Sequence, residues 1–293
     1  MNNKTGIAAI VLTLLGGLIP ATASHAQTLT SLGKTNVSAQ FNPAFYEASG
    51  LGLSNGQNAL WSISDGELKV YKLNLNGTSI ESFAPTPVDP GSTVASVDFE
   101  GVTFAPPPAG ISDDHFIYVA NEAVQAILPV NYSTRQYYAQ ARLLNMTGYG
   151  SVGCTGGGTV SSAFSGSDAN SGLEGITWDG TYFYVIKEKD PGLIIKVSAN
   201  LTTILACKVL SLPSATDYSD ISYDPTRGLF WIASDEAENV YLYNWSTNSM
   251  VKGWHLGIAN MEGISFNPSN SRLSIATDNG DGSDSYLYGF SVQ

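Results

Sequence analysis

The chain has 293 residues and a formal net charge of −12, with 25 acidic residues against 13 Lys and Arg. Such a charge disfavours nucleic-acid partners and anionic lipid surfaces, whereas it favours divalent cations. Charged residues make up only 13% of the chain, while Gly (30 residues) and Tyr (15 residues) are abundant. This composition suits strands and tight turns better than helices.

The first 26 residues have the pattern of a signal peptide. Lys4 precedes an apolar run at 6–19, and the small residues Ser24 and Ala26 come just before Gln27. This pattern predicts export, cleavage after Ala26 and a periplasmic or secreted protein. The apolar run is short for a bilayer span and no other long one follows, so we expect no membrane insertion. A single domain is predicted over 27–293.

Five copies of a repeat occupy the rest of the chain. The first strand-like segment of each copy reads EASGLGL (47–53), DFEGVTF (98–104), GLEGITW (172–178), DYSDISY (217–223) and NMEGISF (260–266). A second segment ends in an acid in every copy: LWSISD (60–65), IYVANE (117–122), FYVIKE (183–188), FWIASD (230–235) and LSIATD (273–278). A third segment follows in all five copies and a fourth in the first four. Short runs rich in β-branched and aromatic residues, bounded by turn residues, are typical of antiparallel strands.

The copies start roughly 51, 74, 45 and 43 residues apart, which is within the range of propeller blades except for one long interval. The sequence therefore predicts an all-β fold, a five-bladed β-propeller of four-stranded antiparallel blades. Six blades, with one hidden in the longest interval, is the alternative. That interval contains a Gly/Ser-rich insertion at 147–171, which predicts a surface loop. The fifth copy stops after its third strand, so we expect the segment 29–41 to supply the fourth and to close the ring.

Two cysteines, Cys154 and Cys207, are compatible with one disulfide in an oxidising compartment. Two independent buried thiols are the alternative. Neither residue lies in a CxxC motif, so redox catalysis has no support. The sequence also lacks an HExxH motif, which removes the usual anchor of zinc peptidases.

Carboxylates recur at two positions of the repeat. The first set comprises Glu100, Glu174 and Glu262, with Ser49 and Ser219 at the equivalent positions, and the second comprises Asp65, Glu122, Glu188, Asp235 and Asp278. In a propeller the inner strand begins at the face to which the second strand returns, so both sets should converge at one mouth of the central channel. So many like charges need a compensating cation, and oxygen ligands without repeated His or Cys favour calcium. The alternative for some of these acids is that they only accept N–H bonds from turns.

The alternation of these motifs resembles the SdiA-regulated propeller family, with further likeness to NHL-repeat and phytase-like propellers. The closest likeness is carried by KEKDPGLIIKV (187–197) and DYSDISYDPTRGLFWIASDE (217–236). The resemblance implies a five-bladed propeller with a bound calcium ion, exported in Gram-negative bacteria and without a defined biochemical role. The chain departs from the pattern at Asp220, which replaces a Gly. This acid either adds to the ring of carboxylates or distorts one blade.

Two functions follow as hypotheses. The first is a monomeric binding module that recognises a protein, peptide or glycan. The second is a calcium-dependent esterase or phosphoesterase acting on a small ester, in which Lys187 and Lys189, beside Glu188, face an anionic group. Because phosphate-binding propellers need many cations and this chain has few, the binding module is favoured.

Overall fold

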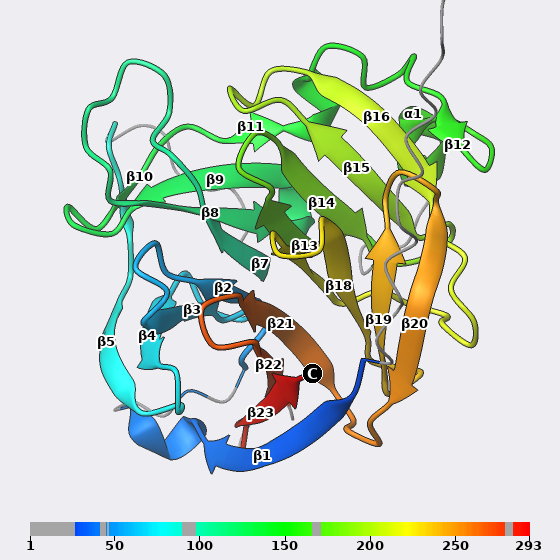
Figure 1. The fold of residues 1–293 in the computed structure, drawn as a ribbon. Coiled ribbons are helices and arrows are strands. Elements are labelled where there is room, and N and C mark those ends of the chain that lie inside the picture. The colour runs from blue at the N-terminus through cyan, green and yellow to red at the C-terminus, as the bar shows by residue number, and fades with distance from the viewer. Residues whose placement is uncertain (1–26, 42–44, 46, 90–97, 166–170, 279–283) are drawn as a thin grey trace, which may run out of the picture.

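The computed structural model describes residues 27–41, 45, 47–89, 98–165, 171–278 and 284–293; the predicted signal peptide (1–26) lies outside them. Five mainly antiparallel sheets stand around a common axis (Figure 1). The protein is therefore a five-bladed β-propeller, as predicted. The alternative of six blades is wrong, because the residues of the longest interval add strands to existing sheets instead of forming a new one.

Each blade begins with its inner strand. Blade 1 contains β2 (Leu51–Leu53), β3 (Ala59–Ile63), β4 (Val70–Asn74) and β5 (Ser79–Phe83). Blade 2 contains β7 (Phe99–Phe104), β8 (Phe116–Asn121), β9 (Ala126–Asn131) and β10 (Gln136–Tyr137), with β6 (Thr86–Pro87) and β11 (Ala141–Arg142) at its outer side. Blade 3 contains β13 (Leu173–Trp178), β14 (Phe183–Lys187), β15 (Leu193–Val197), β16 (Ile204–Val209) and β12 (Cys154–Thr155).

The last two blades are the most regular. Blade 4 contains β17 (Asp220–Asp224), β18 (Leu229–Ser234), β19 (Asn239–Asn244) and β20 (Ser249–His255). Blade 5 contains β21 (Met261–Asn267), β22 (Arg272–Thr277), β23 (Tyr286–Val292) and β1 (Leu29–Asn36). The few helical turns are η1 (Ser38–Gln40), η2 (Glu122–Val124), η3 (Leu143–Asn145) and α1 (Val160–Phe164).

The ring is closed by the N-terminal strand, as the truncated fifth copy predicted. β1 pairs antiparallel with β23, from Leu29 opposite Val292 to Asn36 opposite Tyr286. The two ends are further tied because Thr28 and Gln293 exchange backbone hydrogen bonds. The closure joins the first strand to the last sheet and so holds the ring of blades shut.

The inner strands approach one another closely around the axis. A Cβ placed on Gly50 would lie 2.6 Å from the Cα of Gly101, and one on Gly101 would lie 2.7 Å from the Cα of Gly175. Only glycine permits such backbone contact. The Gly that recurs in the repeat thus sets the radius of the channel and holds the flanking positions of neighbouring blades at short range.

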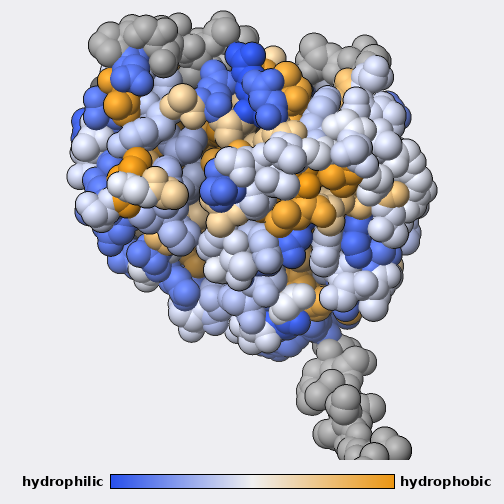
Figure 2. Space-filling view, turned by 90° about the horizontal axis from the view of Figure 1, so that it is seen from above, coloured by the Kyte–Doolittle hydropathy of each residue, from blue (hydrophilic) through white to orange (hydrophobic). Residues whose placement is uncertain are grey.

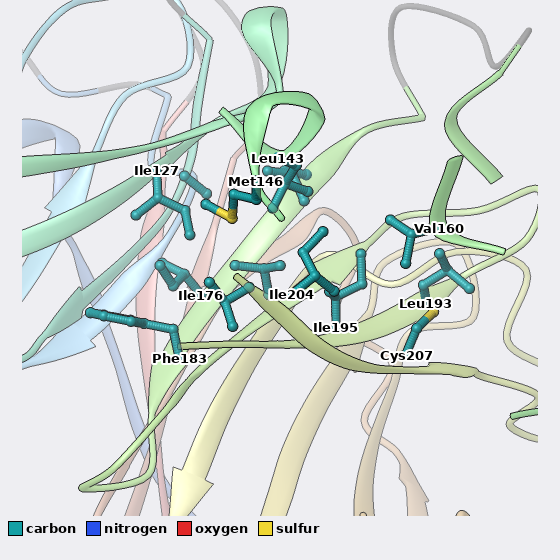
Figure 3. Packing of buried hydrophobic residues seen from close by; sticks show 14 of the residues in the cluster. Ile127, Leu143, Met146, Val160, Ile176, Phe183, Leu193, Ile195, Ile204 and Cys207 are labelled. Atoms are coloured by element: carbon teal, nitrogen blue, oxygen red, sulfur yellow. The ribbon is translucent and has the colours of Figure 1, made fainter. Parts of the chain in front are cut away.

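The hydrophobic core lies between adjacent blades. Its largest cluster joins blades 2 and 3 and includes Ile127, Phe183 and Ile195 (Figure 3). The insertion at 147–171 contributes to this cluster through Val160 and Ala163, both buried. It is therefore not only a surface loop, because β12 adds to blade 3 in parallel with β16 and α1 packs on the core.

The disulfide expected from the two cysteines is present between Cys154 and Cys207. It links directly paired residues of β12 and β16. The second prediction, two independent thiols, is wrong. The disulfide fixes the insertion to the outer strand of blade 3.

The outer surface mixes polar and apolar side chains. In the face shown by Figure 2, apolar residues form separate small areas among hydrophilic ones. Within the described part of the chain, no helix is long and apolar enough to cross a membrane.

Candidate metal centre at one mouth of the channel

Three glutamates of the repeat lie at irregularities of the inner strands. The pairing register shifts between Phe99 and Gly101 in blade 2 and between Met261 and Gly263 in blade 5. A similar shift in blade 3 spans residues 173–176. The residues inside these shifts include Glu100, Glu262 and Glu174, respectively. A bulge leaves its extra residue outside the ladder and turns the side chain away from the sheet.

The other two blades lack this arrangement. The pairings of β2 with β3 and of β17 with β18 contain no register shift over their described residues. Ser49 and Ser219 stand there in place of Glu. Ser219 donates its hydroxyl to the Met261 carbonyl. At this position of the repeat, carboxylates therefore come from three blades only.

The second set of acids follows the second strand of each blade. Glu122 opens η2 directly after β8, and Glu188 comes directly after β14. Asp278 occupies the same place after β22. Because the second strand runs antiparallel to the first, its end returns to the bulged end of the inner strand.

Both sets meet in one cavity of about 350 Å³. Its lining consists of Ser49, Asp65, Asp98, Glu100, Glu122, Glu174, Glu188, Glu262 and Asp278. Seven of the eight predicted carboxylates are among these residues. The exception is Asp235, whose Oδ1 accepts a hydrogen bond from the Met261 amide at 3.1 Å and which does not line the cavity.

Asp98 was missed by the sequence reasoning. It opens the segment DFEGVTF, at a position where Glu47 and Asp217 stand in two other copies. That recurrence was the available signal. Asp217 itself has a different role, since its carboxylate accepts hydrogen bonds from Ser234 and from the amides of Asp235 and Glu236.

Within the cavity, two groups of three carboxylates are tight enough to hold a cation. One oxygen each of Asp98, Glu100 and Glu122 lie within 4.8 Å of one another, and the same holds for Glu122, Glu174 and Glu188. Glu122 belongs to both groups. A third group, Asp113, Asp114 and His115, lies elsewhere, before β8, and is largely exposed.

Hydrogen bonds orient these acids but do not satisfy all their oxygens. Glu122 Oε1 accepts from the Gly172 amide at 2.5 Å. Glu188 Oε1 lies 2.7 Å from Lys189 Nζ, whereas Glu188 Oε2 is buried without a hydrogen-bond partner. A buried carboxylate oxygen without a partner is costly, and it indicates that a ligand belongs there.

The crowding raises the pKa values of the carboxyl groups. Burial raises the pKa of Glu174 well above its ordinary value, and the charges of Glu100 and Glu122 raise it further. The pKa of Glu100 is also raised well above its ordinary value, first by burial and then by Asp98. Burial also raises the pKa of Glu122, to about 7. Without a cation the cavity would therefore hold protons that these groups lose in water.

The pKa of Glu262 is likewise raised, first by burial and then by Asp235 and Asp278. Burial and the charge of Asp278 raise the pKa of Asp65. Asp235 thus contributes to the field of the cavity although it does not line it. A divalent cation would replace the protons and remove the repulsion.

The two lysines beside Glu188 have partners within the protein. Lys187 is fully buried, and its Nζ donates to the Lys189 carbonyl. Lys189 Nζ pairs with Glu188 and, at 3.4 Å, with Glu236. Neither ammonium group is therefore left unpaired for an anionic substrate.

Asp220 does not add to the carboxylate cavity. Its side chain is fully buried, and its Oδ2 accepts hydrogen bonds from the amides of Ile264 (2.8 Å) and Leu51 (3.3 Å). Nor does it distort its blade, because β17 pairs with β18 in unbroken register. The replacement of Gly by Asp instead places a carboxyl group that links the inner strands of blades 4, 5 and 1.

Fold and site together define a five-bladed propeller with an acidic channel mouth. Residues 159–271 match the model of a family described as SdiA-regulated, which confirms the resemblance over that part of the chain. No curated protein matches the sequence.

Solved structures share the fold at low sequence identity. Glutaminyl cyclase from Myxococcus xanthus is 10% identical with a TM-score of 0.59, covering 91% of this chain and 97% of that one. The PQQ-bound aldose sugar dehydrogenase from Streptomyces coelicolor is 13% identical with a TM-score of 0.52, covering 91% and 98%. At such identities the likeness extends to the propeller fold alone.

Proposed function

We propose that the protein is an exported, calcium-binding β-propeller that acts as a binding module. The residues that would hold the ion are Glu122, Glu174 and Glu188, with Glu100 and Asp98 beside them. Export is supported by the signal-peptide pattern of the first 26 residues. A role as a binding module is supported by Lys187 and Lys189, which both have partners within the protein.

The donor set fits calcium. Calcium takes six to eight oxygen ligands in flexible geometry, and carboxylates are the usual source. The cavity lining contains only carboxylates and one serine, with no nitrogen or sulfur ligand. The orphaned Glu188 Oε2 is the single observation that carries the proposal, because it is buried within a group of carboxylates spaced to share one ion.

A bound ion would act mainly on the structure. Glu122 comes from blade 2, whereas Glu174 and Glu188 come from blade 3. Calcium would join these blades and neutralise their repulsion. Removal of the ion should therefore loosen the ring at this mouth, while the opposite mouth keeps its shape.

The calcium-dependent esterase is the weaker hypothesis. It requires a group to hold the anionic part of a substrate, and the two lysines predicted for this role are already paired. Turnover of p-nitrophenyl acetate and p-nitrophenyl phosphate, with and without EDTA, tests it directly. Metal-dependent turnover that disappears in Glu174→Gln would make the protein an enzyme.

Calcium binding is tested by titration of EDTA-stripped protein in a calorimeter, together with its melting curve. We expect a saturable heat and a rise in melting temperature, since an ion at 100 times its Kd stabilises by about 2.7 kcal/mol. Glu122→Gln should weaken binding at least tenfold. Glu81→Gln, a control on the outer strand β5, should leave it unchanged. If the stripped protein shows neither heat nor a melting shift with calcium, the proposal fails.

A further inference from the structure

The other mouth of the channel contains a second cavity, of about 270 Å³. The inner strands of all five blades line it with residues near their C-terminal ends. The two mouths thus belong to the same strands, β2, β7, β13, β17 and β21, and they lie at opposite ends. This second cavity has no role in the calcium proposal.

Hydroxyl groups recur around the second cavity. Thr103, Thr177, Ser222 and Ser265 occupy the same position of the repeat, and all four line it. Blade 1 has Gly52 there, because a Cβ would lie 2.5 Å from the Val102 carbonyl oxygen. The repeat therefore supplies a ring of hydroxyl groups that is interrupted at one blade.

Two of these hydroxyls are fixed as acceptors. Thr177 Oγ1 accepts from the Tyr223 amide, and Ser222 Oγ accepts from the Phe266 amide, each at 3.0 Å. No acceptor for their own hydrogens is found among the described residues. Each hydroxyl can accordingly donate to a ligand, and its oxygen is already held in place from the neighbouring blade.

Aromatic side chains occupy the next position of the repeat. Phe104, Trp178 and Tyr223 are half-buried and line the cavity. The Trp178 ring packs on Phe183 with centroids 4.7 Å apart, and Tyr223 packs on Phe230 at 5.2 Å. Because the core fixes one side of each ring, a ligand that contacts the exposed side loses little side-chain entropy on binding.

The cavity has almost no charge. Among the described residues that line it there is no Lys, Arg or Glu, and Asp179 is the one acid. Asp179 Oδ1 accepts from the amides of Thr181 and Tyr182, both at 2.7 Å. An anionic ligand would leave water without a partner charge here, and the one acid is already engaged with backbone amides, so the site favours a neutral ligand.

We propose that this cavity binds a single neutral sugar ring. Its C–H faces match the aromatic walls, and its oxygens accept from the ring of hydroxyl groups. The cavity is slightly smaller than the roughly 300–1,000 Å³ of sites for drug-sized ligands, which fits one ring. A free monosaccharide and the end of a glycan share this chemistry. The inference rests on the binding-module part of the proposed function and is independent of calcium.

The test is saturation-transfer NMR with glucose, galactose, mannose and N-acetylglucosamine. A second arm uses an oligosaccharide ending in the best monosaccharide, and a third uses glucuronate. We expect transfer to at least one neutral sugar and at least tenfold weaker binding of glucuronate. Tighter binding of the oligosaccharide would identify a glycan end as the ligand, whereas equal binding would identify the free sugar.

The variants locate the site. Trp178→Ala should weaken binding at least tenfold, and Trp178→Phe should restore part of it. Thr103→Val, which removes only a hydroxyl with a single long contact of 3.5 Å, should weaken binding several-fold. Thr30→Val, on the exposed outer strand β1, is the matched control and should have no effect. A melting curve of each variant establishes that it is folded.

EDTA separates this inference from the calcium proposal. Sugar binding should persist in EDTA and in Glu174→Gln. No transfer to any neutral sugar, equal binding by folded Trp178→Ala, or loss of binding in EDTA would each overturn the inference. If calcium binds and sugars do not, this inference alone fails, and the opposite result removes only the calcium site.

Discussion

The two mouths of the channel are built from the same five strands, yet their chemistry is opposite. One is lined by carboxylates, and burial raises the pKa values of Glu100, Glu122 and Glu174 among them. The other is lined by hydroxyl groups and aromatic rings, with one acid among its described residues. In the repeat they are only three to four positions apart: Glu174 belongs to the first and Thr177 and Trp178 to the second. The difference follows from local pairing, because bulges release the glutamates from the ladder while the hydroxyl positions remain in regular register.

The two mouths should differ in how strongly they depend on charge. The proposed cation site lies at the acidic mouth, so the properties of this mouth should depend on pH and on metal. The neutral mouth is held by backbone hydrogen bonds between blades and should depend on neither. Variants and conditions that affect one mouth and leave the other unchanged are therefore the sharpest tests.

The largest effect is expected from pH in the absence of metal. The pKa of Glu122 is raised to about 7, so between pH 4.5 and 7 the folded protein binds more protons than the unfolded chain. The free energy of unfolding is therefore not reduced by this group near pH 4.5 and below. It falls as the pH rises through 7, by roughly 3 kcal/mol for this group alone. Urea unfolding in EDTA at several pH values measures it.

Saturating calcium supplies the control for this prediction. The bound ion compensates the ionised carboxylates, so the loss of stability with rising pH should shrink. Sugar binding at the other mouth should not change over the same pH range. A metal-free protein that becomes more stable from pH 4.5 to 7 contradicts the assignment of raised pKa values to this cavity.

In the repeat, Asp220 lies between the positions that line the two cavities. It follows Ser219, which stands at the repeat position of the inner-strand glutamates, and it precedes Ser222, which lines the neutral cavity. Its carboxyl group accepts from three backbone amides, those of Leu51, Ile221 and Ile264. Asp220→Ala would leave these donors buried without partners, so we expect a loss of about 3 kcal/mol in the free energy of unfolding.

Asp220→Asn is the matched variant. Burial raises the pKa of Asp220 well above its ordinary value, so its neutral form is favoured, and an amide resembles that form. We expect a change within about 1 kcal/mol, measured by the same urea unfolding. If Asp220→Asn lowered the free energy of unfolding as much as Asp220→Ala does, the ionised carboxylate would be required.

The next prediction compares two acids near the acidic mouth. Glu174 lines the cavity, whereas Asp235 lies outside it and binds the Met261 amide. Glu174→Gln removes a charged ligand and should weaken calcium at least tenfold, the equivalent of about 1.4 kcal/mol. Asp235→Asn should change the calorimetric Kd by less than threefold. Equal effects would indicate that overall charge, and not coordination, determines binding.

The arrangement of blades could be predicted because each copy of the repeat carries its own strand pattern. The closing strand followed from the missing fourth strand of blade 5. The positions of most carboxylates followed from the same logic, since antiparallel strands return to a common end.

The remaining features depend on contacts that a repeat pattern does not encode. Asp235 follows its strand as Glu122 does, but β17 pairs with β18 without a bulge and the side chain binds the adjacent strand. The burial of Lys187 and the pairing of Lys189 depend on the turn after β14. The neutral mouth was present in the sequence as aligned Thr, Ser and aromatic positions. That these positions enclose a cavity could be known only from the distance between the blades, which the sequence does not give.

The smallest effect is expected at Lys189, which competes with a bound ion for Glu188. Its Nζ lies 2.7 Å from Glu188 Oε1, while Oε2 of the same group remains without a partner. Lys189→Met should tighten calcium binding by about fivefold, because a unit charge about 4 Å away contributes about 1 kcal/mol in water. The free energy of unfolding should fall by less than about 1 kcal/mol, as is usual for an ion pair that is partly exposed.

The control for Lys189 is Lys196→Met on β15, which removes the same charge from a side chain that lies over the Tyr182 ring. Calorimetric titration of both variants distinguishes a local effect from one of net charge. Tighter calcium binding in Lys189→Met alone places the ion next to Glu188. Equal gains in both variants would mean that the ion responds only to the total charge, and weaker binding in Lys189→Met would mean that this lysine holds Glu188 in the geometry that the ion requires.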